Sequence, residues 1–103
     1  MSTLLYGASR TSIRIDDRAL AHLQTVITTK LRRNEGLLIQ WENPVESGSG
    51  RGAFWVHPQC DLMYEYDGGR EPSLDAAELD RLMMEAAGTR GLRITAEERA
   101  VAA

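Results

Sequence analysis

The sequence predicts an α+β fold, namely a single small domain with a mainly antiparallel sheet, two helices and the element order ββ-α-βββ-α-β. Two observations carry this prediction. Residues 17–33 and 73–87 place apolar side chains at helical spacing, whereas the other segments alternate polar and apolar residues over a few positions. Glycine, proline or aspartate closes most of those short segments, as is typical of strands joined by turns.

The first elements are two strands and a helix. Residues 3–6 form a short apolar run, and residues 12–15 alternate, which indicates a hairpin. Asp16 or Asp17 then caps a helix that runs to about Arg33, because aspartate side chains accept hydrogen bonds from the first free N–H groups of a helix.

This helix has two faces of different character. Its apolar stripe, which is expected to face the core, consists of Leu20, Leu23, Ile27 and Leu31. The opposite face is expected to be solvated and carries Arg18, His22, Thr25, Thr29, Arg32 and Arg33.

Three strands follow, at residues 37–42, 53–57 and 61–66. Trp41 alternates with other apolar residues of the first of these strands, so it is expected in the core. Residues 43–52 are rich in glycine and serine and predict a flexible loop.

The second helix begins at Pro72-Ser73, with Ser73 as its cap, and ends before Gly88. Its buried stripe consists of Leu79, Leu82, Met83 and Ala86. Residues 92–95 predict a last short edge strand. The domain therefore covers residues 1–95, and residues 96–103 are expected to form a frayed tail.

Composition excludes several classes of protein. The net charge of −3 argues against a dedicated nucleic-acid coat. Cys60 is the single cysteine, so an intramolecular disulfide cannot form, and no His/Cys cluster suggests a metal. No apolar run approaches the length of a membrane span, and the start of the chain lacks the pattern of a signal peptide. We expect a cytoplasmic domain without a cofactor.

The segment from Glu65 to Arg70, Glu-Tyr-Asp-Gly-Gly-Arg, resembles the nucleotidyl-transfer motif of ATP-dependent DNA ligases, Lys-x-Asp-Gly-x-Arg. In that family the lysine attacks the α-phosphate of ATP and carries AMP. Here Glu65 stands in its place, and a carboxylate neither forms that phosphoramidate nor attracts a phosphate. A strand followed by an Asp-Gly turn is the favoured interpretation, so no catalytic residue is assigned.

Arg51, Trp55 and His57 are the candidate binding residues. Trp55 and His57 share one face of a strand, opposite Phe54 and Val56, so an exposed aromatic surface for a partner is expected there. Such aromatics beside an arginine also suit the stacking of nucleic-acid bases. The loop at residues 47–52 could add backbone N–H groups for a phosphate, although a plain hairpin loop is favoured because the ending of a P-loop is missing.

A second candidate surface would bind phosphate groups through the basic face of the first helix and its neighbours. It consists of Arg14, Arg18, His22, Lys30, Arg32 and Arg33. A solvated helix surface is the more usual meaning of such a face.

The chain resembles a family of small uncharacterised actinobacterial proteins, which often carry the automatic label of an ATP-dependent DNA ligase. The segments that carry the resemblance cover most of the chain: Leu5-Tyr6-Gly7, residues 15–24, residues 30–33, Trp41-Glu42, residues 48–51, residues 55–58 and residues 91–93. The resemblance implies no activity, cofactor or catalytic residue.

Two classes of function are therefore expected. The first is a small non-catalytic binding or accessory domain with a protein partner or a second copy of itself, since an open sheet face suits a homodimer. The alternative is a nucleic-acid-binding accessory protein linked to DNA metabolism. An enzyme of the ligase type is the least favoured class.

Overall fold

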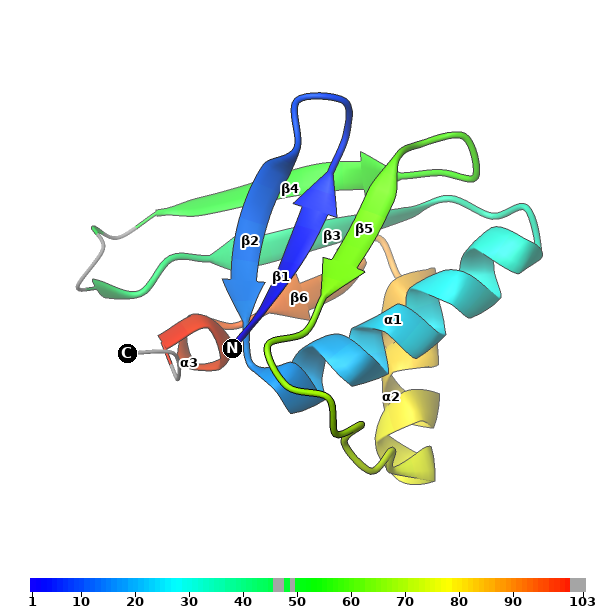
Figure 1. Cartoon of the computed structure of the whole chain (residues 1–103). Coiled ribbons are helices and arrows are strands. Elements are labelled where there is room, and N and C mark those ends of the chain that lie inside the picture. Colours follow the sequence, from blue (N-terminus) through cyan, green and yellow to red (C-terminus); the bar gives the residue numbers. More distant parts are fainter. Residues whose placement is uncertain (46–47, 49, 101–103) are drawn as a thin grey trace.

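The α+β prediction is confirmed. The computed structural model describes residues 1–45, 48 and 50–100 and has the order ββαβββαβ followed by one short helix (Figure 1). The strands are β1 (Ser2–Tyr6), β2 (Thr11–Ile15), β3 (Leu37–Glu42), β4 (Arg51–Val56), β5 (Leu62–Glu65) and β6 (Leu92–Ile94). The helices are α1 (Asp17–Arg32), α2 (Ala76–Ala87) and α3 (Ala96–Ala100).

The strands form two sheets of three strands each, where the sequence suggested a single sheet. In the first, the order is β2-β1-β5 and all pairs are antiparallel. In the second, the order is β4-β3-β6, with β3 and β4 antiparallel and β6 parallel to β3. The α2 helix lies between β5 and β6 in the sequence and makes the crossover that the parallel pair requires.

The sheet β2-β1-β5 crosses over β3 and β4 of the second sheet (Figure 1). The α1 and α2 helices lie together on one side of the two sheets. Between these layers lies one core cluster, whose fully buried members include Leu4, Ile15, Leu20 and Ile39. Trp41 packs against this cluster with its ring 5.6 Å from that of Phe54, as expected from its alternation.

The α1 helix begins and ends as its sequence predicts. The side chain of Asp16 accepts a hydrogen bond from the Ala19 N–H at 3.1 Å, and the apolar stripe is buried apart from Leu31, which is partly buried. Asn34 adopts a φ of 61°, the left-handed conformation that ends helices.

The α2 helix begins two residues later than predicted. Ser73 is not its cap. Asp75 is, and its carboxylate accepts a hydrogen bond from the Ala77 N–H at 3.1 Å. The predicted stripe is confirmed, with Leu82 and Ala86 buried, and Gly88 is the C-cap.

The end of the described chain also differs from the expectation of a frayed tail. Residues 96–100 form α3, which packs beside β2 and β3. The Glu98 carboxylate accepts a hydrogen bond from the Thr95 N–H at 2.9 Å, and the Glu98 backbone C=O accepts one from the Asp16 N–H. The Arg99 guanidinium donates a hydrogen bond to the Asn43 side chain. These contacts attach a helix that is too short to be stable alone. Residues 101–103 lie outside the described residues.

None of the helices in the described part of the chain combines the length and the apolar character that crossing a bilayer requires.

Candidate functional site

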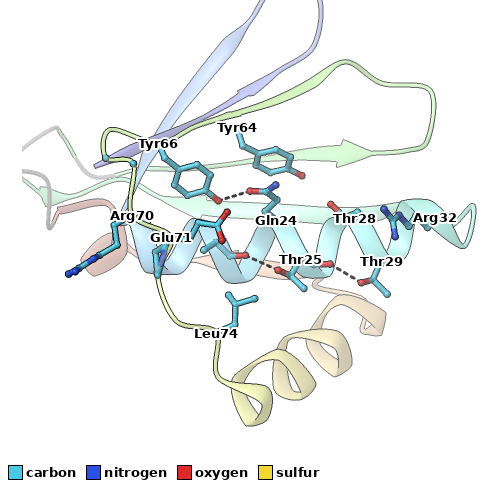
Figure 2. Close-up of a pocket in the computed structure, with 14 residues that line it drawn as sticks. Gln24, Thr25, Thr28, Thr29, Arg32, Tyr64, Tyr66, Arg70, Glu71 and Leu74 are labelled. Carbon is cyan, nitrogen blue, oxygen red and sulfur yellow. Dashed lines mark hydrogen bonds between the residues drawn. The ribbon is translucent and has the colours of Figure 1, made fainter.

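A polar groove of about 750 Å³ lies between α1, β5 and the segment that joins β5 to α2 (Figure 2). Helix α1 supplies one wall, β5 and Tyr66 supply a second, and residues 68–74 supply a third. Its polar and aromatic lining side chains include Gln24, Thr25, Thr28, Thr29, Arg32, Tyr64, Tyr66 and Arg70.

The wall formed by α1 presents threonines at helical spacing. The hydroxyls of Thr25 and Thr29 donate hydrogen bonds to the backbone C=O groups of Ala21 and Thr25 at 3.1 and 2.8 Å. Each hydroxyl oxygen keeps lone pairs that can accept a hydrogen bond, and the threonine methyl groups add small apolar patches. This face therefore suits a ligand that carries both N–H donors and small apolar groups.

The wall formed by β5 presents two tyrosines, because side chains two apart in a strand share one face. Tyr66 donates a hydrogen bond to the Oε1 atom of Gln24 at 2.7 Å. Burial raises the pKa of Tyr66 to about 12, and the charge of Asp17 adds to the effect. Burial also raises the pKa of the Tyr64 hydroxyl. Both hydroxyls therefore stay protonated well above neutral pH, and the Tyr66 hydrogen is already donated to Gln24.

The ligase-like segment divides between the groove and the opposite face of β5. Tyr66, Gly68, Gly69 and Arg70 line the groove. Glu65 lies on the other face of β5, is exposed, and stands 3.9 Å from Arg10. The position that holds the attacking lysine in ligases thus points away from this groove.

Charged side chains stand at the two ends of the groove. Arg32 lies at the C-terminal end of α1, and Arg70 and Glu71 lie at the far end (Figure 2). Within the described residues, no ion pair involves Arg32 or Arg70. The two guanidinium groups are thus available to a ligand.

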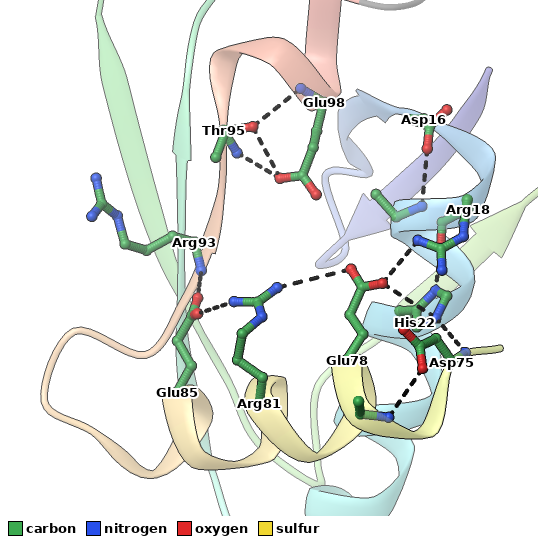
Figure 3. Close-up of polar contacts among 12 residues, drawn as sticks. Asp16, Arg18, His22, Asp75, Glu78, Arg81, Glu85, Arg93, Thr95 and Glu98 are labelled. Carbon is green, nitrogen blue, oxygen red and sulfur yellow. Dashed lines mark hydrogen bonds and ion pairs between the residues drawn. The ribbon is translucent and has the colours of Figure 1, made fainter.

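His22 does not face solvent, contrary to the sequence prediction. Its exposed fraction is 0%, because α2 packs on the face of α1 that carries it (Figure 3). Its Nδ1 atom lies 2.8 Å from the Arg18 C=O, and its Nε2 atom accepts a hydrogen bond from the Asp75 N–H at 3.0 Å. In this arrangement Nε2 is the acceptor, and Nδ1 is the atom that donates to the Arg18 C=O. His22 therefore joins α1 to the first turn of α2 and is not a phosphate ligand.

The other predicted phosphate-binding residues do not form one basic patch. Arg14 pairs with Asp67 at 3.3 Å, Arg18 with Glu78 at 2.8 Å, and Lys30 with Glu35 at 3.2 Å. Arg32 and Arg33 remain exposed at the end of α1. Asp67 and Glu78 come from distant parts of the chain, which is why the sequence did not reveal these two pairs.

Arg51 and Trp55 lie on the outer face of β4, with Trp55 54% exposed. The Trp55 ring lies over Gly36, where an added Cβ would come within 2.5 Å of it. His57 follows the end of β4, and its Nδ1 atom accepts a hydrogen bond from the Gln59 N–H at 3.1 Å. Trp55 lies four positions beyond Arg51 along β4, about 13 Å, so the three side chains form a line and not one pocket.

The expected phosphate loop is described only in part. Ser47 and Ser49 lie outside the described residues. Among the residues that are described, no group of three or more His, Cys, Asp and Glu side chains is placed to hold a metal ion.

The fold and the groove define a small α+β domain with a recessed polar surface beside an edge strand. The chain belongs to the family described as Domain of unknown function (DUF7882), whose model matches residues 1–97. Comparisons with curated proteins and with solved structures gave no match.

Proposed function

We propose that this protein is a small non-catalytic binding domain whose main site is the groove between α1 and β5. The observation that carries the proposal is the wall of Tyr64, Tyr66 and the α1 threonines, whose hydroxyl oxygens keep lone pairs that can accept hydrogen bonds in an open recess. We further propose the cytoplasm as its compartment.

The ligase label that the resemblance attaches to such proteins receives no support from the groove. A covalent AMP adduct needs a lysine beside the α-phosphate, and no lysine lines this recess. Glu65 stands in the motif position and faces the other way. An unchanged intact mass after incubation with ATP and magnesium, beside a functional ligase as positive control, is the expected result.

Ligand-observed NMR screening with a library of small polar and aromatic fragments tests the binding proposal. The Thr28→Arg variant fills the groove from a helical position where arginine is well tolerated. Thr89→Arg makes the same change at an exposed site outside the groove and is the matched control. We expect fragments that bind the native protein and the control but not Thr28→Arg. Equal binding to all three proteins would reject the groove.

A second surface supports the partner or homodimer role that the sequence suggests. The exposed Trp55 and Arg51 on the outer face of β4 offer an aromatic and a charged contact on an edge strand. If a second copy binds there, Trp55→Ala lowers the association constant measured by sedimentation equilibrium. A native protein that stays monomeric at high concentration would remove the homodimer from consideration.

A nucleic-acid-binding accessory role is the alternative function. It is supported by Arg32, Arg33 and Arg70, which have no acidic partner among the described residues. Its signature is binding of labelled single-stranded DNA that weakens steeply with salt, since phosphate contacts release counterions. If the anisotropy of the labelled DNA does not change when the protein is added, even at low salt, this role is excluded.

A further inference from the structure

Strand β5 ends the sheet β2-β1-β5, so one of its edges has no strand partner in the described part of the chain. The Gly7 N–H donates to the Asp61 C=O at 2.9 Å, which makes Gly7 and Asp61 a hydrogen-bonded pair. Hydrogen bonding alternates along an antiparallel strand, so Met63 and Glu65 also bond to β1. The backbone N–H and C=O groups of Leu62 and Tyr64 therefore face away from β1.

The groove lies on the same strand. Tyr64 and Tyr66 point from β5 toward α1, and α1 forms the facing wall (Figure 2). An edge strand beside a helix is one of the arrangements in which proteins bind an extended peptide, because the peptide backbone completes the free edge and its side chains enter the groove.

We propose that the groove binds an extended segment of another protein chain, added to the sheet as a strand beside β5. This inference rests on the proposed function and names the occupant of its site. A peptide is favoured over a nucleic acid because its backbone offers alternating N–H and C=O groups at the spacing of the open edge.

The groove also selects the side chains of that segment. Residues of the peptide that point toward α1 meet the methyl groups of Thr25 and Thr28 and the rings of the two tyrosines, so small or β-branched apolar residues fit there. Arg32 stands at one end without an acidic partner among the described residues. The segment therefore carries an aspartate or glutamate that reaches Arg32.

Selection from a random library of displayed peptides on the immobilised native protein supplies the probe. We expect enriched peptides that combine β-branched residues with a terminal acid. Their affinity falls about tenfold in Arg32→Glu, through loss of the charge pair, and is lost in Thr28→Arg. It is unchanged in Thr89→Arg. Urea unfolding of each variant shows that the losses do not reflect unfolded protein.

Two measurements identify strand addition itself. Methylation of single backbone nitrogens of the selected peptide should weaken binding about fivefold at every second position, because each lost hydrogen bond contributes about 1 kcal/mol. Binding should slow amide exchange at Leu62 and Tyr64 and leave Met63 unchanged. Affinity losses that do not recur at every second methylated position would overturn the inference.

Other outcomes separate this inference from the proposed function. If fragments bind the groove but no peptide is enriched, the groove remains the binding site and the inference of a bound peptide is overturned. Failure of both would overturn both. Binding of labelled single-stranded DNA that Thr28→Arg abolishes would overturn the peptide in favour of nucleic acid. Dimerisation of the native protein that Thr28→Arg abolishes would assign the edge to a second copy.

Discussion

Replacing His22 with alanine tests the strongest disagreement between the sequence and the structure. A histidine on a solvated helix face would contribute almost nothing to stability. In the structure the ring is fully buried, and Nε2 accepts the Asp75 N–H at the start of α2. The substitution removes this acceptor and also leaves a cavity between α1 and α2.

The expected loss of stability follows from these two effects. An unsatisfied backbone donor costs about 1–3 kcal/mol. Deleting a buried side chain of this size costs about 2 kcal/mol or more. His22→Ala should therefore lower the free energy of unfolding by about 3–5 kcal/mol, a large part of the roughly 5–15 kcal/mol that stabilises a small domain.

Urea unfolding followed by tryptophan fluorescence and circular dichroism measures this loss. With a slope of about 1–1.5 kcal/mol/M for a domain of this size, the midpoint should fall by about 2–5 M. Arg18→Ala is the control, because its pair with Glu78 is exposed and such pairs contribute about 0–1 kcal/mol. His22→Gln keeps an acceptor and should lose less than His22→Ala. A loss below about 1 kcal/mol in His22→Ala would refute the buried bridge.

Three further predictions follow from single contacts. Gly91→Ala should unfold most of the protein, as judged by circular dichroism, because Gly91 has a φ of 67° and a Cβ there would lie 2.1 Å from the Leu38 backbone oxygen; a native spectrum would contradict this. The neutral Tyr66 hydroxyl stabilises the fold fully below its ordinary pKa of 10.0, and this contribution is lost as the pH rises to about 12. The free energy of unfolding of Tyr66→Phe should therefore fall less steeply with pH in alkali than that of the native protein. The Ser2 hydroxyl, which donates to Asp17, holds the pKa of that carboxyl below 3.8, and NMR titration of Ser2→Ala should show this pKa rising; an unchanged pKa would argue against the bond.

The local patterns of the sequence predicted the elements well. Helix α1, its Asp16 cap and its buried stripe follow from spacing alone, and so does the alternation of Tyr64 and Tyr66 along β5. These features depend on neighbours in the chain. The cap of α2 was assigned to Ser73 and not to Asp75, because the side chains of both residues suit a cap. The choice between them depends on the contact between the Asp75 N–H and His22.

The groove was not predicted, because its walls are joined only by tertiary packing. The polar face of α1 was expected to be solvated, whereas α2 covers His22 and residues 68–74 border the threonines. One signal was present in the sequence: Thr25, Thr28 and Thr29 stand where a fully solvated helix usually carries charges. The division into two sheets was equally hidden, since the pairing of β6 with β3 spans half of the chain.

The most direct test of the groove as the working surface is a two-dimensional amide NMR spectrum of the native protein titrated with a fragment that binds it. We expect the largest shifts at Gln24, Thr28 and Tyr64, and small shifts at Trp55. Shifts centred on Trp55, with Gln24 and Tyr64 unchanged, would contradict the account and move the working surface to the outer face of β4.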